Sequence, residues 1–217
     1  MRNLFLLCLI MVLMLSCKEN YEEIPIEDPQ VVFNYLPMKT GNYWVYRHYQ
    51  IDTLGNVTET QRTDSVIISG DSMINDKRYF VFKGTHYPYN PNWGLIDVLR
   101  DSIGYIVNAN GIIKFSKDNF TDILASKTEI VGGDTIYTLN YQMENPDSIV
   151  TLPAGEFSVL NYKGTVRTPM KLKGIPNPRY MNTFYADGVG CVVETYFYLN
   201  HPTIYEKRLI WYKAEKE

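Results

Sequence analysis

Hydrophobic and polar residues alternate with a period of two, not 3.6, along the chain from Tyr35 onward. Residues 44–49 show the pattern, with bulky side chains alternating across the segment, and turn-forming residues follow at 52–56. Further turns are expected at 71–76, 108–111 and 131–134. Strands are expected at 57–69, 78–82, 105–107, 112–115, 135–143, 147–152, 157–166, 189–199 and 204–213. This pattern predicts a mainly β domain of about 10–12 strands, arranged as a single antiparallel, strongly curved sheet or as an open barrel or sandwich.

Helix signals are weak throughout the same region. One or two helical turns are predicted at 119–126, where Asn119 or Thr121 would cap the first turn, so we expect at most one short helix. Pro88, Pro91 and Trp93 predict one long loop, and residues 169–178 predict another.

The chain begins with a short positive segment and an unbroken apolar run over 4–15, which ends at Ser16 and Cys17. A helix of this length would reach about 18 Å, well short of the ~30 Å hydrocarbon core of a bilayer. We therefore predict that residues 1–16 are a secretory signal peptide and not a membrane span.

The end of this run, Met14-Leu15-Ser16-Cys17, resembles the lipobox of bacterial lipoproteins, although Met14 and Leu15 depart from its usual residues. The resemblance implies that Cys17 receives a diacylglycerol and anchors the protein to the outer membrane, since several acyl chains make a stable anchor. The alternatives are ordinary signal-peptide cleavage and a buried Cys17 without a special role. Lys18-Glu19 resembles the lipoprotein export signal of Bacteroidetes, which favours the cell surface over the periplasmic face.

Composition separates a tether from the β-rich domain, and it argues against a disordered chain and against nucleic-acid binding. Residues 17–34 are acidic and contain Pro25 and Pro29, which predicts a tether, and 35–217 are expected to form one β-rich domain. A hydrophobic content of 45% with 21% charged residues excludes wholesale disorder. A net charge of −3 gives no basis for nucleic-acid binding.

Residues that could carry catalysis are sparse. His48 is predicted to face solvent from a strand, while His86 and His201 lie in predicted loops, and none has metal-ligand spacing. Cys191 is the one cysteine outside the leader and the lipidation site, and its apolar neighbours predict a small buried hydrophobe. Nucleophile-elbow and phosphate-loop motifs are absent from the sequence. We therefore predict no catalytic residue, no metal and no cofactor.

Asp followed by Ser or Thr and an aliphatic residue occurs six times in the sequence. The pattern resembles the O-glycosylation motif of exported Bacteroidetes proteins, which implies modification at Thr53, Ser65, Ser72, Ser102, Thr135 and Ser148. The competing interpretation is local structure, in which a turn-favouring Asp precedes a β-former and an aliphatic residue.

Tyr87, Tyr89 and Trp93 are candidate ligand-binding residues, because they crowd a predicted Pro-containing loop. Exposed aromatic rings stack on sugars or anchor protein interfaces. The alternative is that the loop folds back on the sheet through these rings. Tyr196, Tyr198, Trp211 and Tyr212 lie on predicted strands and are expected to fill or coat the sheet.

Three further motifs resemble those of uncharacterised exported Bacteroidetes lipoproteins. The segment at 35–46 resembles their Y-P-L-x-x-G-N-x-W-x-Y opening, 152–157 their P-A-G-x-F turn, and 185–192 their Y-x-x-G-V-G-x-V segment. The resemblance implies a curved, β-rich sheet or open barrel related to lipoprotein carriers, and it implies no activity. In physical terms, the three motifs are typical of tight turns and a strand bend.

The leading hypothesis is a non-catalytic envelope lipoprotein that acts as a binding or interaction module, with an apolar ligand held in an open barrel. The alternative is a glycan-binding accessory lipoprotein that uses Tyr87, Tyr89 and Trp93. The partners are then the membrane, through the lipid, and an unknown small ligand, glycan or protein. A large apolar cavity would favour the first hypothesis and an exposed aromatic platform the second. A buried His–carboxylate pair would favour a third, an enzyme such as a hydrolase.

Overall fold

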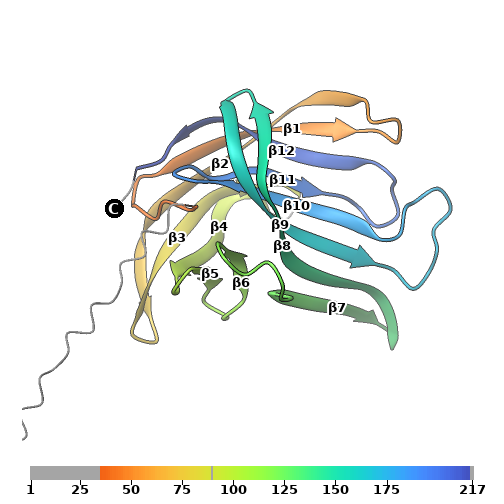
Figure 1. Ribbon diagram of the computed structural model, residues 1–217, viewed down its shortest axis with the longest axis horizontal. Helices are drawn as coiled ribbons and strands as arrows, with labels where there is room; N and C mark the ends of the chain where they lie inside the picture. The colour runs from red at the N-terminus through yellow and green to blue at the C-terminus, as the bar shows by residue number, and fades with distance from the viewer. Residues whose placement is uncertain (1–34, 89, 216–217) are drawn as a thin grey trace, which may run out of the picture. The chain divides into compact units, whose positions relative to one another are not determined.

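The computed structural model describes residues 35–88 and 90–215, which form an all-β domain (Figure 1). The predicted leader, Cys17, the tether and Tyr89 lie outside the described residues. The strands are β1 (Tyr43–Ile51), β2 (Val57–Ile74), β3 (Lys77–His86), β4 (Asn90–Asp101), β5 (Tyr105–Asn108), β6 (Ile113–Ser116), β7 (Ala125–Val131), β8 (Asp134–Leu152), β9 (Gly155–Arg167), β10 (Arg179–Ala186), β11 (Gly190–Tyr196) and β12 (Ile204–Lys213).

The 12 strands of the described residues belong to one antiparallel sheet in the order β6-β5-β4-β3-β2-β1-β12-β11-β10-β9-β8-β7. Strands that are consecutive in sequence are neighbours in the sheet, except β6 and β7, which are its two edges, while the first strand pairs with the last. The predicted fold class is confirmed. Within the described ranges there is no helix, and so none that could span a membrane.

The predicted helical turns at 119–126 are replaced by a side-chain-stabilised turn. Asn119 Oδ1 accepts hydrogen bonds from the backbone N–H groups of Thr121 and Asp122, at 3.3 and 3.1 Å. Such side-chain bonds compete with helix formation. Strand β7 then begins at Ala125.

Three predicted boundaries are wrong. Strand β2 continues to Ile74, and the turn is the residue pair Asn75 and Asp76, whose φ angles are 50° and 58°. Strand β8 joins the two runs predicted at 135–143 and 147–152, across an irregularity in register after Glu144. Strand β4 includes Pro91, because it pairs with β5 only from Leu99 onward and its first half is a sheet edge, where proline is tolerated.

The sheet curves until its two edges approach each other. The Tyr162 hydroxyl, on β9, donates a hydrogen bond of 2.6 Å to the carbonyl of Ile113 on β6. The Ser116 N–H, also on β6, donates to Met143 Sδ on β8 at 3.4 Å. These bonds join the edge strand β6 to β8 and β9 near the opposite edge, so the sheet is a nearly closed barrel whose concave side encloses the core.

Two of the three sequence motifs meet inside this core. Trp44 Nε1 donates a 2.7 Å hydrogen bond to the carbonyl of Val189, and the Tyr46 hydroxyl donates to the carbonyl of Cys191 at 2.9 Å. The opening motif therefore fixes the turn of the third motif. This geometry agrees with the prediction that both motifs build the fold.

Candidate functional site

A cavity of about 250 Å³ lies on the concave side of the sheet. Aromatic and aliphatic side chains from strands on both halves of the sheet form most of its wall; they include Trp44, Tyr46, Phe82, Ile96, Tyr141, Tyr162 and Tyr185. Two further lining residues carry opposite charges that compensate, because Lys114 Nζ lies 3.5 Å from Asp97 Oδ2.

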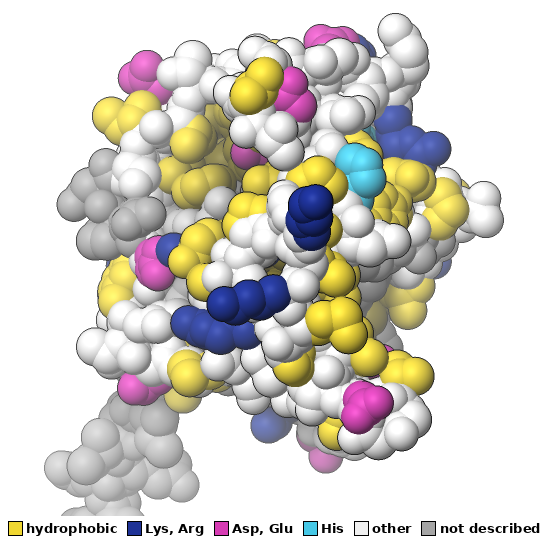
Figure 2. All heavy atoms as spheres, turned by 90° about the vertical axis from the view of Figure 1, so that its right-hand side faces the viewer, with side chains coloured by type: hydrophobic (Ala, Val, Ile, Leu, Met, Phe, Trp, Pro, Cys, Tyr) yellow, Lys and Arg dark blue, Asp and Glu magenta, His cyan; other side chains and the backbone are white. Residues whose placement is uncertain are grey.

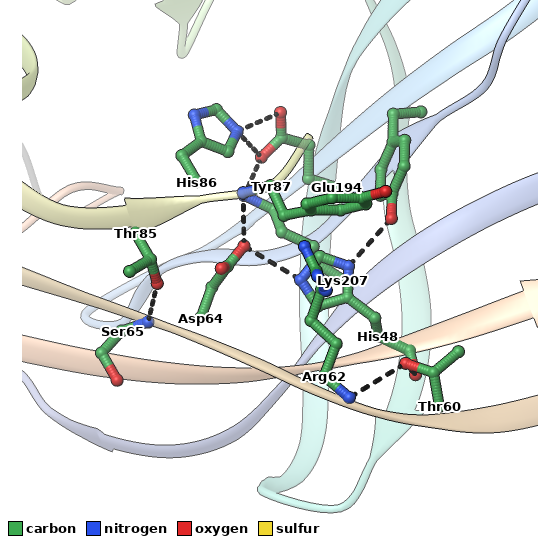
Figure 3. Close-up of polar contacts among 11 residues, drawn as sticks. His48, Thr60, Arg62, Asp64, Ser65, Thr85, His86, Tyr87, Glu194 and Lys207 are labelled. Atoms are coloured by element: carbon green, nitrogen blue, oxygen red, sulfur yellow. Dashed lines mark hydrogen bonds and ion pairs between the residues drawn. The ribbon is translucent and has the colours of Figure 1, made fainter. Parts of the chain in front are cut away.

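A layer of polar and charged side chains, whose contacts are drawn in Figure 3, borders the cavity through His86, Glu194 and Lys207. Lys207 Nζ, on β12, lies 2.5 Å from Glu194 Oε2 on β11, and His86 Nε2 on β3 lies 3.2 Å from both Glu194 oxygens. His48 on β1 faces Lys207 in the strand register, and His48 Nε2 lies 2.9 Å from Asp64 Oδ2 on β2. These five residues form what we call the polar layer.

Electrostatics keep both carboxylates of the polar layer ionised. Burial alone would raise the pKa of Glu194, but the charge of Lys207 and contacts with His86 hold it well below its usual value. Burial likewise opposes ionisation of Asp64, but the hydrogen bond from His48 and the charge of Lys207 lower its pKa. Each buried charge therefore has a partner, as burial requires.

The polar layer continues into a second hollow. Both ring nitrogens of His48 have polar partners: Nε2 lies 2.9 Å from Asp64 Oδ2, and Nδ1 lies 3.0 Å from the Tyr196 hydroxyl. The backbone N–H of Tyr87 also donates to Asp64, at 3.0 Å. Beyond these residues lies an open groove of about 420 Å³, here called the tyrosine groove, lined by His48, Thr60, Gln61, Arg62, Tyr87, Tyr196 and Tyr205.

The predictions for two of the three histidines are wrong. His48 is 1% exposed, because it shares the inward-facing parity of Trp44 and Tyr46 on β1. His86 ends strand β3 and is half-buried against Glu194, where a surface loop was expected. His201 is exposed, as predicted. The sequence contained a signal for His48, which lies two and four residues after the inward-facing Tyr46 and Trp44. It contained none for the contact of His86 with Glu194, 108 positions away.

The predicted aromatic loop is absent, because β3 and β4 are joined by a short turn. Tyr87 turns toward the tyrosine groove, where its ring makes edge contacts with His48 and Tyr196. Trp93 lies on β4 with 58% of its surface exposed, and Tyr89 lies outside the described residues. The three candidate residues are therefore not shown to form a common platform. Figure 2 shows one face of the molecule, on which hydrophobic side chains are interspersed with Lys and Arg.

The six candidate glycosylation positions differ in exposure. Thr53 and Ser72 are exposed, and the other four, Ser65, Ser102, Thr135 and Ser148, are half-buried. Two of the preceding aspartates have structural roles: Asp52 accepts backbone hydrogen bonds from Leu54 and Asn56 in its turn, and Asp64 belongs to the polar layer. Local structure therefore explains the aspartate in two of the six Asp-Ser/Thr-aliphatic segments.

Cys191 lies at the cavity wall and is half-buried, which is less complete than the predicted burial. Its low-polarity surroundings and the nearby Glu194 charge raise the pKa of its thiol to about 12. Among the described residues, no three His, Cys, Asp or Glu side chains are grouped as metal ligands.

Comparison with known proteins gives two structural similarities. No family model and no curated protein matches the sequence. A protein from Parabacteroides distasonis described as a lipoprotein is 16% identical, with a TM-score of 0.48 over 85% of this chain and 100% of its own. A protein from Bacteroides fragilis described as an exported protein with a YmcC-like fold is 14% identical, with a TM-score of 0.46 over 82% of this chain and 98% of its own. At these values the similarities say nothing about a ligand or an activity.

Proposed function

We propose that this protein is a non-catalytic envelope lipoprotein whose barrel binds a small apolar ligand. The observation that carries the proposal is the cavity of about 250 Å³, with its mainly aromatic and aliphatic wall. A dry apolar cavity of about 150 Å³ already binds benzene, whereas drug-sized ligands occupy about 300–1,000 Å³. The size therefore suits a short alkyl chain or a small ring system.

The charges at the cavity favour an uncharged ligand. Lys207 is paired with Glu194 at 2.5 Å, and Lys114 is paired with Asp97 at 3.5 Å. A ligand with a carboxylate or an ammonium group would have to break one of these pairs to gain a partner. For the Lys207–Glu194 pair, whose lysine is buried, removing one partner costs about 3–5 kcal/mol.

The buried His48–Asp64 pair also invites comparison with an enzyme, but its chemistry supports a structural role. Both ring nitrogens of His48 are engaged, by Asp64 and by the Tyr196 hydroxyl. Burial raises the pKa of Tyr196, and that of the Cys191 thiol to about 12, so neither group is an activated nucleophile.

The binding proposal is tested with uncharged n-alcohols that compete with the fluorescent probe N-phenyl-1-naphthylamine. Each buried methylene contributes about 0.8 kcal/mol, so affinity should rise about fourfold per carbon and then level off when the cavity is full. Absence of probe binding, or an affinity that rises without limit as for a micelle, would contradict the proposal.

Two neighbouring positions on β7 provide a matched pair of variants. Ala125 lines the cavity, whereas Ser126 is exposed on the opposite face of the strand. Ala125→Phe should fill part of the cavity and shorten the longest alcohol that gains affinity. Ser126→Phe should leave the dependence of affinity on alcohol chain length unchanged.

The envelope part of the proposal is supported by the leader and Cys17 in the sequence. Its test is fractionation of cells that express Cys17→Ala. The parent should partition with outer membranes, and the variant should lose that association. An unchanged distribution of the variant would remove lipidation at Cys17 as the anchor.

A further inference from the structure

We propose that the tyrosine groove is a second ligand site, separate from the apolar cavity, and that it binds a saccharide carrying a carboxylate. The polar layer lies between the two hollows: His86, Glu194 and Lys207 line the cavity, whereas His48 lines the groove. The two sites can therefore be tested independently.

The exposed ring of Tyr198, beside the groove, gives the site its stacking surface. The buried ring of Tyr196, 2% exposed, is stacked on that of Tyr205 at 5.2 Å with planes 12° apart. This pair supports Tyr198, which packs edge-on against Tyr205 at 6.1 Å and remains 42% exposed. Flat, amphipathic rings of this kind offer an apolar face together with a polar edge, which matches the C–H faces and hydroxyl groups of a sugar.

Hydroxyl groups lie close to one another along the groove. The hydroxyls of Tyr87 and Tyr198 are 3.2 Å apart, so each presents a further donor or acceptor beyond the bond they share. The Gln61 side chain is exposed in the same wall. A ligand with several hydroxyl groups can exchange its water for these partners.

Arg62 adds a positive charge that is held in place. Its guanidinium lies 3.4 Å from the centre of the Tyr87 ring, a cation–π contact that orders the side chain. Among the described residues, no carboxylate lies within ion-pair distance of Arg62, although it is exposed at the groove. A planar guanidinium without a carboxylate partner is suited to bidentate binding of a carboxylate from a ligand.

The test compares trigalacturonic acid with its methyl ester, which has the same rings without the charge, by calorimetry on the purified mature protein. We expect the acid to bind at least about tenfold more tightly than the ester, as for a charge-assisted pair. Arg62→Gln should reduce the affinity for the acid to that for the ester, and Arg62→Lys should retain part of the preference. Arg78→Gln is the control, because Arg78 also lies over an aromatic ring, 4.7 Å from that of Phe80, on another part of the sheet.

A second pair of variants tests whether the sugar stacks on the Tyr198 ring. Tyr198→Ala should weaken binding of both the acid and the ester, whereas Tyr180→Ala, with a similar exposure of 43%, should weaken neither. The proposal is overturned if neither saccharide binds, if Arg62→Gln has no effect, or if acetate and phosphate compete as well as the trisaccharide does. Displacement of the naphthylamine probe by n-alcohols should be unchanged in all these variants, which separates failure of this site from failure of the cavity.

Discussion

His86 Nε2 on β3 lies 3.2 Å from both carboxylate oxygens of Glu194 on β11, although β2, β1 and β12 lie between their strands in the sheet. In a flat sheet, four strand spacings of about 4.8 Å would hold the two backbones about 19 Å apart. The contact therefore shows that the sheet curves strongly enough for β3 and β11 to face each other at the polar layer. The same curvature brings His86 and Glu194 together in the cavity wall.

Replacement of Lys207 by methionine should destabilise the protein strongly. The lysine is 4% exposed and pairs with Glu194, so the variant leaves a buried carboxylate without its cation. We expect the free energy of unfolding to fall by about 3–5 kcal/mol, measured by urea denaturation.

Two further variants test whether pairing is the cause. Lys207→Met combined with Glu194→Met should recover much of the loss, because a buried pair replaced by apolar side chains is often neutral. Lys213→Met removes an exposed partner of Glu215 and should cost less than about 1 kcal/mol. A double variant as unstable as Lys207→Met would contradict the pairing argument.

Acid should destabilise the fold through the same layer. The pKa values of Glu194 and Asp64 are lowered on folding from ordinary values of 4.5 and 3.8. As the pH falls, these two carboxylates therefore take up protons in the unfolded chain before they do so in the folded protein. Their contribution to stability is complete above pH 4.5 and 3.8, respectively. It is lost as the pH falls from there toward the folded-state pKa values. Urea denaturation between pH 7 and pH 3 should show this loss.

The variant Glu194→Gln should make that pH dependence shallower, whatever its effect at pH 7. Glu156→Gln, which changes an exposed carboxylate on β9, should leave the slope close to that of the parent. Equal slopes in all three proteins would mean that Glu194 does not contribute.

The predicted parts of this fold are those that local pattern determines. Alternation over residues 44–49 identified strand β1, and Asn108 to Gly111 identified the hairpin that joins β5 to β6. The pattern does not say how far a strand continues through an irregularity, which is why β8 was predicted as two runs. Pro91 alone predicts a loop, because only the order of the whole sheet reveals that the first half of β4 is an edge.

The candidate site was mostly beyond the reach of the sequence. Glu194 and Lys207 are opposite each other only because β11 pairs with β12, and His86 joins them only because the sheet closes. His48 is the exception, since the parity of β1 placed it with two core aromatics. Polar residues at inward positions of a barrel are therefore the signal to examine first in such a sequence.

Substitution of Gly84 by alanine should disrupt the pairing of β2 with β3. A Cβ atom at this position would lie 1.9 Å from the carbonyl oxygen of Ser65, and the φ angle of 151° is unfavourable for other residues. The obstacle is backbone, which cannot move without breaking the ladder. We expect a loss of more than about 3 kcal/mol in the free energy of unfolding, or failure to fold.

The control for this variant is Gly55→Ala. Gly55 also has a positive φ, of 83°, but a Cβ there meets no atom within 4 Å. The free energy of unfolding of this variant should fall by only about 1–2 kcal/mol, the cost of placing a residue with a Cβ atom in the left-handed conformation. Similar losses at both positions would show that the φ angle, and not the close approach, explains the effect.

The Cys191 thiol should react slowly with thiol reagents in the folded protein. Its pKa of about 12 leaves little thiolate at pH 8, and its side chain is half-buried at the cavity wall. We expect reaction with 5,5′-dithiobis(2-nitrobenzoic acid) to be at least about a hundredfold slower than in urea, because the thiolate is the reactive form. Cys191→Ser identifies the signal that belongs to this residue. Saturation of the cavity with an n-alcohol should slow the folded-state reaction further, whereas a fast reaction that the alcohol leaves unchanged would place the thiol outside the cavity wall.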